Sequence, residues 1–146
     1  MQIRTMQIED YDAVFALWKS CSGMGLNDVD DSRSGIERFL QRNSETCLVA
    51  VEKTAIIGAI LVGSDGRRAY IYHTAVAPER QKQGIGSQLV QAAKKAVQKI
   101  GIAKMALVVF SRNQSGNAFW EKQGFSARED LTYRNLALQE MTRMDT

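Results

Sequence analysis

The sequence predicts a mixed α/β fold in a single domain that covers residues 1–146, with about six to seven strands and about four helices. Two observations support this prediction. Short β-branched apolar runs follow one another along the chain with longer stretches between them, in which apolar residues recur every three or four positions. The length of 146 residues and the hydrophobic content of 45% suit one domain with a sizeable core.

In the first half of the chain, the pattern predicts one strand, two helices and a β-hairpin. A loop rich in Gly, Asn and Asp is expected between the two helices. Glu9 and Asp10 would lie in the first turn of the first helix, where negative charge is favourable, and Ser32 or Ser34 can cap the second. The expected elements are a strand at 1–6, helices at 9–20 and 33–42, and a hairpin of strands at 46–52 and 55–63.

The second half predicts a strand at 68–77, a helix at 84–99, a strand at 104–110, a helix at 115–123 and a last strand at 132–138. The helix at 84–99 has a clear apolar face, and Gly101 is placed to end it. The residues of that face are Leu89, Val90, Ala93, Ala96, Val97 and Ile100.

The most informative segment is the glycine-containing turn at residues 81–87, between the strand at 68–77 and the helix at 84–99. Glycines let backbone amides approach a ligand, and the N-terminus of the helix favours an anion such as a phosphate. The spacing excludes two common phosphate loops. A P-loop needs a lysine after its last glycine, whereas Gly86 is followed by Ser87. A dinucleotide fingerprint needs a third glycine at the position of Leu89.

The turn Gln81-Lys82-Gln83-Gly84-Ile85-Gly86 instead resembles motif A of the GCN5-related N-acetyltransferase (GNAT) family, Gln/Arg-x-x-Gly-x-Gly/Ala. A second segment about thirty residues on, at 113–125, is similar to the family's Asn-x-x-Ala-x-x-x-Tyr-Glu-Lys-x-Gly-Phe. The resemblance implies a mostly antiparallel central sheet, with a splayed parallel strand pair at the cofactor site. It also implies acetyl-CoA as cosubstrate and a primary amine of a small molecule or protein as acceptor.

The same resemblance assigns roles to individual residues. The backbone near the end of the strand would pair with the pantetheine arm and thioester, residues 81–87 would hold the pyrophosphate, and Asn113 would bond the pantetheine arm. Arg80, Lys82, Arg112 or Lys122 would meet the ribose 3′-phosphate. The cofactor-binding residues expected in this way are Thr74, Ala75, Val76, Gln81, Lys82, Gln83, Gly84, Ile85, Gly86, Ser87, Asn113, Gly116, Trp120 and Lys122.

The proton-transfer groups are less well defined, because Trp120 occupies the position of the family's acid tyrosine and an indole is no acid at neutral pH. The candidates that remain are His73, Tyr72 and Tyr133. His73 suits a general base, and its alternative is a structural strand histidine. Strand alternation would put Tyr72 and His73 on opposite faces. The missing tyrosine also keeps open a non-catalytic CoA-binding module, and a more remote alternative is an unrelated nucleotide-phosphate binder.

Composition limits the other function classes. The net charge of +3 comes from scattered basic residues and predicts no nucleic-acid partner, and the sequence has no apolar run long enough for a membrane span. Cys21 and Cys47 favour a reduced, cytoplasmic setting and suggest no metal site. Three carboxylates in the loop at 24–31 would attract a cationic amine or simply be solvated. Relatives of the family are often homodimers, for which the last strand would be a pairing edge.

Overall fold

The computed structural model describes residues 1–145 and shows a five-stranded mixed sheet with four α-helices. Thr146 lies outside the described residues, so the single domain at 1–146 stays a prediction. The strands are β1 (Gln2–Thr5), β2 (Leu48–Glu52), β3 (Ala55–Ser64), β4 (Ala69–Val76) and β5 (Met105–Leu107). The helices are α1 (Tyr11–Ser20), α2 (Arg33–Arg42), α3 (Ile85–Lys99) and α4 (Gln114–Lys122), with short 3₁₀ helices η1 (Ile8–Asp10) and η2 (Pro78–Arg80).

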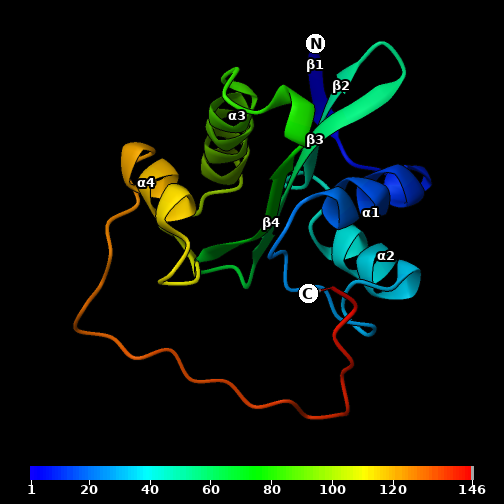
Figure 1. Ribbon diagram of the computed structural model, residues 1–146. Coiled ribbons are helices and arrows are strands. Elements are labelled where there is room, and N and C mark those ends of the chain that lie inside the picture. The colour runs from blue at the N-terminus through cyan, green and yellow to red at the C-terminus, as the bar shows by residue number, and fades with distance from the viewer. Residues whose placement is uncertain (146) are drawn as a thin grey trace.

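The sheet separates two helical layers, as Figure 1 shows: α1 and α2 cover one face, and α3 and α4 lie on the other. Its strand order is β1-β2-β3-β4-β5; β4 and β5 are parallel, and the other neighbouring strands of the described residues are antiparallel. Each layer has its own apolar core, built around Trp18 on the α1 side and around Leu89 on the α3 side. None of the helices in residues 1–145 has the length and apolar character needed to cross a membrane.

Helix ends follow the sequence signals closely. The Ser32 side chain accepts a hydrogen bond from the backbone N–H of Gly35 at 3.1 Å, so Ser32 is the N-cap of α2. Gly101 follows α3 with φ of +86°, the left-handed conformation that glycine adopts without strain. The predicted apolar face of α3 is buried at Leu89, Val90 and other positions, whereas Ile100 at its end is 40% exposed.

The predicted number of strands was too high, because the expected last strand at 132–138 does not form. This segment has no regular secondary structure and pairs with no strand of the described chain, and every residue from 126 to 143 is exposed. The strand expected at 104–110 is also shorter, since β5 is confined to Met105–Leu107. A strand needs a neighbour to satisfy its backbone groups, and sequence alternation alone does not provide one.

A β-bulge in β4 overturns the expected alternation of its side chains. Ile60 pairs with Thr74 and Val62 pairs with Ile71, so the single residue Leu61 opposes both Tyr72 and His73. The extra residue turns Tyr72 and His73 toward the same side of the sheet. The ring of Tyr72 contacts Phe39 of α2, and the ring of His73 contacts Trp18 of α1.

Candidate active site

The turn between β4 and α3 has the backbone geometry of an anion-binding loop. Gly84 is the N-cap of α3 with φ of +85°, and Lys82 is also left-handed at φ of +64°. A non-glycine residue in this region is strained, and such strain is often found where backbone amides face a ligand. A Cβ at Gly84 would meet no atom within 4 Å, so Gly84 is required by its φ and leaves open space around it.

The N-terminus of α3 presents unpaired donors beside this turn. The first helical hydrogen bond runs from Gln88 N–H to the Gly84 carbonyl at 3.1 Å, and no side chain caps the helix. Consequently the N–H groups of Ile85, Gly86 and Ser87 have no acceptor within residues 1–145. Ile85 is 4% exposed and packs in the core, which anchors the first turn and fixes the direction of these donors. Together with the helix dipole, they form a site for a phosphate group.

Beside the turn, β4 separates from β5 and leaves an open strand edge. The two strands pair only from Ala69↔Met105 to Ile71↔Leu107. Beyond Ile71, β4 has no neighbour on this side among the described residues, although its other edge pairs with β3 as far as Val76. The hydroxyl oxygen of Thr74 is buried and has no hydrogen-bond partner in the described chain. An extended ligand with amide groups would satisfy such an edge.

The candidate residues of the turn are held by their own network. Gln81 Nε2 donates to the Val76 carbonyl at 3.1 Å, and the Gln83 carboxamide oxygen accepts from Arg80 Nε at 3.1 Å. Gln123 Nε2 donates to Ser87 Oγ at 2.8 Å and so ties the end of α4 to the start of α3. Hydrogen bonds therefore hold the turn to the end of β4 at Gln81 and to the end of α4 at Ser87.

Of the four basic residues considered for the 3′-phosphate, Arg80 is already engaged. Its guanidinium forms a bidentate pair with the Glu52 carboxylate, and this pair lowers the pKa of Glu52. Arg112 lies over the ring of Phe110 at 4.3 Å from its centroid, and it forms no ion pair within residues 1–145. Lys82 and Lys122 are exposed and form no ion pair within residues 1–145.

Asn113 is the N-cap of α4. Its side-chain oxygen accepts a hydrogen bond from the backbone N–H of Gly116 at 2.9 Å. A Cβ on Gly116 would lie 2.4 Å from the Asn113 carboxamide, which explains the glycine there. Trp120 packs edge-on against Phe119 and Phe125, with ring centroids 4.9 and 5.3 Å away. The expected contacts of these residues with a cofactor stay predictions.

On the α1 side of the bulge, the structure brings together a pair that the sequence did not indicate. His73 Nε2 lies 2.7 Å from Asp31 Oδ1, and the two side chains are 14% and 4% exposed. Asn27 N–H donates to the other Asp31 oxygen at 2.9 Å, and the hydroxyl of Tyr11 donates to the Asp31 carbonyl at 2.6 Å. Trp18 packs on the imidazole with 4.8 Å between centroids. Asp31 was expected only as one carboxylate of an acidic loop; its burial arises from tertiary packing.

The contact with Asp31 distinguishes the two imidazole nitrogens of His73. An ionised carboxylate can only accept a hydrogen bond, so beside an ionised Asp31 the hydrogen between the two groups is on Nε2. Nδ1 has no hydrogen-bond partner within residues 1–145. In the neutral imidazole, the lone pair that can accept a proton is then the one on Nδ1.

Next to His73, the tyrosines of β4 form an aromatic surface with α2. Tyr72 contacts Tyr70 and Phe39 with ring centroids 4.7 and 5.5 Å away, and it is 56% exposed. Burial raises the pKa of Tyr70 and of Tyr72, and the nearby phenol of Tyr133 adds to both shifts. Tyr133 itself is 64% exposed, on the segment after α4. The phenols of Tyr70 and Tyr72 stay protonated at neutral pH and can donate hydrogen bonds.

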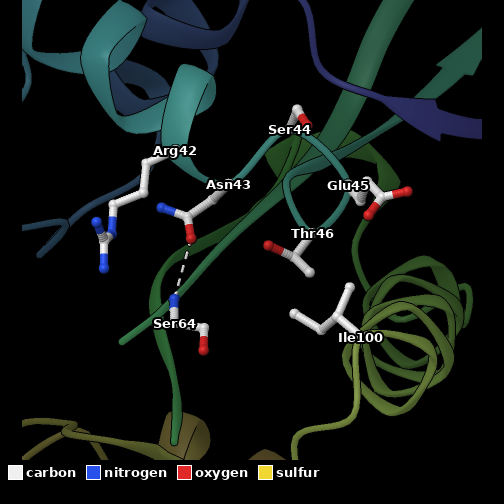
Figure 2. A pocket seen from close by; sticks show the side chains of 7 residues that line it. All are labelled: Arg42, Asn43, Ser44, Glu45, Thr46, Ser64 and Ile100. Atoms are coloured by element: carbon white, nitrogen blue, oxygen red, sulfur yellow. Dashed lines mark hydrogen bonds between the residues drawn. The ribbon is translucent and has the colours of Figure 1, made fainter. Parts of the chain in front are cut away.

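Two surface hollows differ in their relation to this site. The one in Figure 2 lies between the end of α2, the end of β3 and Ile100. Two of its polar groups bond within the chain: Ser64 N–H donates to Asn43 Oδ1, and the Thr46 hydroxyl donates to the Val62 carbonyl. The second hollow reaches the end of β4, because its Cys21 lies 3.5 Å from the Val76 carbonyl. It is lined by Lys19, Ser20, Cys21, Ser22, Arg143, Met144 and Asp145.

Comparison with known proteins gives consistent matches. The sequence profile of the acetyltransferase (GNAT) family matches residues 11–125. An acetyltransferase of Pectobacterium atrosepticum is 30% identical over 132 residues, and one of Yersinia enterocolitica is 29% identical over 131 residues; each match spans 90% of this chain and 92% of the relative.

Among solved structures, the fold is similar to that of the PaiA N-acetyltransferase of Thermoplasma acidophilum in complex with coenzyme A. That match has a TM-score of 0.77 at 22% identity and covers 88% of this chain and 91% of the other. The AAC(6′)-Iy enzyme bound to a bisubstrate analogue matches with a TM-score of 0.72 at 19% identity, over 93% and 98% of the two chains. At these identities the likeness concerns the fold.

Proposed function

The chain belongs to the acetyltransferase (GNAT) family, and from this premise we propose that it is an acetyl-CoA-dependent N-acetyltransferase. The acetyl group would pass directly from the thioester to a primary amine of a small molecule or protein. The observation that carries the proposal is the glycine turn with three free helical N–H groups, placed next to the open edge of β4. This arrangement suits a ligand with a pyrophosphate at one end and an amide-containing arm at the other.

The residues of this chain fit such a cosubstrate. The free N–H groups of Ile85, Gly86 and Ser87 would hold the pyrophosphate. The backbone of residues 74–76 would pair with the amides of the pantetheine arm, and the orphaned hydroxyl of Thr74 would gain a partner there. When bound, the cosubstrate supplies an activated acetyl thioester.

The proton-handling group in the proposal is His73. It directly precedes residues 74–76 of β4, which would line the thioester end, and the bulge turns it toward the α1–α2 side of the sheet. Its Nδ1 would take a proton from the acceptor, either from the ammonium to give the neutral nucleophile or from the amine as it attacks the thioester, while Asp31 keeps the other nitrogen protonated. Asp31 is thus a positioning residue, and the protonated hydroxyl of Tyr72 is a candidate donor toward the leaving thiolate. Tyr133 is a weaker candidate, since the segment that carries it is exposed.

The experiment that tests the function measures thiol release from acetyl-CoA with a panel of primary amines: monoamines, diamines, polyamines, amino acids and lysine peptides. We expect at least one amine class to stimulate release, with an acetylated product detected by mass spectrometry. The alternative function is a non-catalytic CoA-binding module, which Trp120 in place of a tyrosine favours. Binding of acetyl-CoA by calorimetry with no amine-dependent release would support the module and overturn the enzyme.

Two further points complete the proposal. We propose a reduced, cytoplasmic setting, which is supported by two cysteines that are both free thiols. We also propose a homodimer, which is supported by the large apolar side chains that the chain exposes after α4.

A further inference from the structure

Residues 142–145, the tail segment, lie against the loop between α1 and α2. Figure 1 shows this end of the chain on the α1–α2 side of the sheet. Arg143 forms an antiparallel bridge with Asn27, and backbone hydrogen bonds flank the bridge on both sides. On one side, Asp28 N–H donates to a carbonyl of the tail segment at 3.0 Å. On the other side, the Leu26 carbonyl accepts from an N–H of the tail segment at 2.9 Å.

The Asp145 carboxylate adds two contacts to the same loop. One oxygen accepts from Gly25 N–H at 3.0 Å, and the other accepts from Leu26 N–H at 2.9 Å. Burial alone would raise the pKa of Asp145, but the hydrogen bonds from Leu26 and Gly25, together with the nearby Arg143 guanidinium, lower it below its ordinary value of 3.8. Hydrogen bonds to an ionised acceptor are stronger than neutral ones, so Asp145 is the firmest link between the tail segment and the loop.

The tail segment is also attached to α1. Lys19, near the end of this helix, donates from Nζ to the Met144 carbonyl at 2.7 Å. The Met144 side chain packs against the apolar core that contains Trp18. Trp18 in turn packs on the imidazole of His73. The tail segment therefore joins the loop to the helix that lies against the proposed general base.

Asn27 connects the tail segment to that base. In antiparallel pairing, the N–H groups of alternate residues point toward the partner and those between them point away. Accordingly, the N–H groups of Leu26 and Asp28 donate to the tail segment, whereas the N–H of Asn27 donates to Asp31 Oδ2 at 2.9 Å. The other carboxylate oxygen of Asp31 lies 2.7 Å from His73 Nε2. A continuous chain of hydrogen bonds thus leads from the tail segment to the imidazole.

The backbone and the carboxylate of Asp31 are held by different parts of the molecule. The backbone directly precedes Ser32, the N-cap of α2, and its carbonyl accepts from the Tyr11 hydroxyl at 2.6 Å. Within residues 1–145, the carboxylate is held by Asn27 N–H and by His73. Displacement of Asn27 would therefore leave Asp31 next to His73 but would free its carboxylate to rotate.

We propose that the tail segment is a positioning clamp for His73 and acts through Asn27 and Asp31. It sets the direction of the Asn27 N–H, this N–H orients the Asp31 carboxylate, and the carboxylate keeps the hydrogen on Nε2 of His73. Nδ1 is then the nitrogen that accepts a proton. Asp145 is the main positioning residue of the clamp. The inference rests on the proposed function for the role of His73 as a base, whereas the chain of hydrogen bonds can be tested without it.

The first test observes the imidazole directly by NMR, because His73 is the only histidine in the sequence. Nitrogen–proton correlation spectra of the neutral imidazole, recorded at about pH 8–9, distinguish its two tautomers. We expect the unchanged protein to carry the hydrogen on Nε2. Asp145→Ala removes both charge-assisted hydrogen bonds, so it should raise the fraction of the Nδ1–H tautomer several-fold. Hydrogen exchange of the Asn27 amide should become faster by about tenfold in the same variant.

The second test measures steady-state kinetics with an amine that stimulates thiol release. Asp145→Ala should lower kcat by about 2- to 30-fold and leave the dissociation constant of acetyl-CoA within about twofold. Asp145→Asn keeps the size of the side chain and one acceptor oxygen, so it should fold at least as well and give an intermediate loss. Glu140→Ala is the matched control, because it removes an exposed carboxylate that has no hydrogen bond or ion pair within residues 1–145. This control should keep the tautomer and kcat of the unchanged protein.

One outcome would separate a positioning role from simple attachment of the tail segment. If the Leu26 amide exchanges faster in Asp145→Ala while the tautomer of His73 and kcat stay unchanged, the loop positions Asp31 by itself and the proposal is overturned. An equal change in Glu140→Ala would overturn it as well. Inactivity of the unchanged protein with every amine would instead overturn the proposed function, and the tautomer measurement would still decide whether the clamp exists.

Discussion

The contact between His73 and Asp31 gives the sharpest prediction for a single residue. His73→Gln should lower kcat by about 10²–10⁴-fold, the usual contribution of a general base, while the dissociation constant of acetyl-CoA stays within about twofold. Asp31→Asn keeps the size of the side chain but can donate to Nε2 and favour the wrong tautomer, so kcat should fall by a smaller factor with KM nearly unchanged. Steady-state kinetics and calorimetry on the same samples measure both effects.

A second variant, Tyr72→Phe, tests the proposed donor to the thiolate, because it keeps the ring contacts with Phe39 and Tyr70 and removes only the hydroxyl. If Tyr72 protonates the thiolate, this variant also loses kcat; if it only packs, kcat is unchanged. A His73→Gln enzyme with full kcat would show that His73 has only a structural role in β4.

The two thiols should differ sharply in reactivity. Burial raises the pKa of the Cys47 thiol to about 12, although a contact with the Val62 carbonyl opposes this shift, and Cys47 is fully buried. The thiolate is the reactive form, so Cys47 should stay unmodified at pH 8. Cys21 is only partly buried and lines a surface hollow. We expect a disulfide reagent to titrate one thiol per folded chain and two after denaturation; two fast thiols in the folded protein would contradict the burial of Cys47.

Between elements, the 3′-phosphate of the cosubstrate can be assigned by comparing ligands. Of the four basic residues considered for this phosphate, Lys82, Arg112 and Lys122 form no ion pair within residues 1–145. Alanine at the residue that meets this phosphate should weaken CoA binding by about tenfold, the cost of one charge-assisted hydrogen bond, and should leave binding of dephospho-CoA unchanged. Arg80→Ala is the control, since Arg80 is held by Glu52. Equal effects on both ligands for all three variants would exclude them.

The link between β1 and η1 predicts an acid dependence of stability. Arg4 donates two hydrogen bonds to Asp10, at 2.8 and 2.9 Å, and they hold the pKa of Asp10 below its ordinary value of 3.8. A folded pKa below the unfolded one stabilises the protein above the unfolded value, and this stabilisation is lost as pH falls through the folded value. Because Arg4 is partly exposed, we expect Asp10→Asn to cost about 1 kcal/mol at pH 7.

Urea unfolding at pH 7 and at pH 3 measures this effect. The difference in unfolding free energy between Asp10→Asn and the unchanged protein should shrink toward the lower pH, where the carboxylate of Asp10 begins to be protonated. Asp12→Asn is a matched control, because the side chain of Asp12 is 92% exposed and lies 3.9 Å from its nearest cation. A difference that is equal at both pH values would contradict the ion pair as the cause.

The helices and the conformation of the glycine turn at residues 81–87 were predictable because their signals are local. Ser32 and Gly101 set the ends of α2 and α3 through their own side chain or backbone freedom, and Gly84 has the positive φ that a glycine at this turn suggests. The bulge in β4 was not predictable, since it is defined by register against Leu61 of another strand. The burial of Asp31 likewise depends on contacts with distant residues.

In the whole molecule, the two faces of the sheet carry different parts of the candidate site. On one face, the buried side of α3 fixes the free N–H groups of the turn at residues 81–87. On the other face, His73 and Asp31 pair beside the apolar core around Trp18. Strand β4 belongs to both, because its backbone edge is open beyond Ile71 while its bulge turns two side chains toward α1. The absence of the expected last strand also depends on the whole molecule, because residues 132–138 have no neighbouring strand within the described residues.

Stabilisation by the ligand tests whether acetyl-CoA binds at the turn of residues 81–87 and thereby stabilises the folded chain. Acetyl-CoA at about 100 times its dissociation constant should stabilise the folded chain by about 2.7 kcal/mol, which corresponds to a rise in Tm of about 5–10 °C for a protein of this size. Gly84→Asp should abolish most of this rise, because its charge repels the phosphate. Gly84→Asn is the matched control, since Asn and Asp both tolerate a positive φ and have the same shape. Thermal unfolding of the three proteins with and without acetyl-CoA measures the effect, and an equal rise in the Asp and Asn variants would place the pyrophosphate elsewhere.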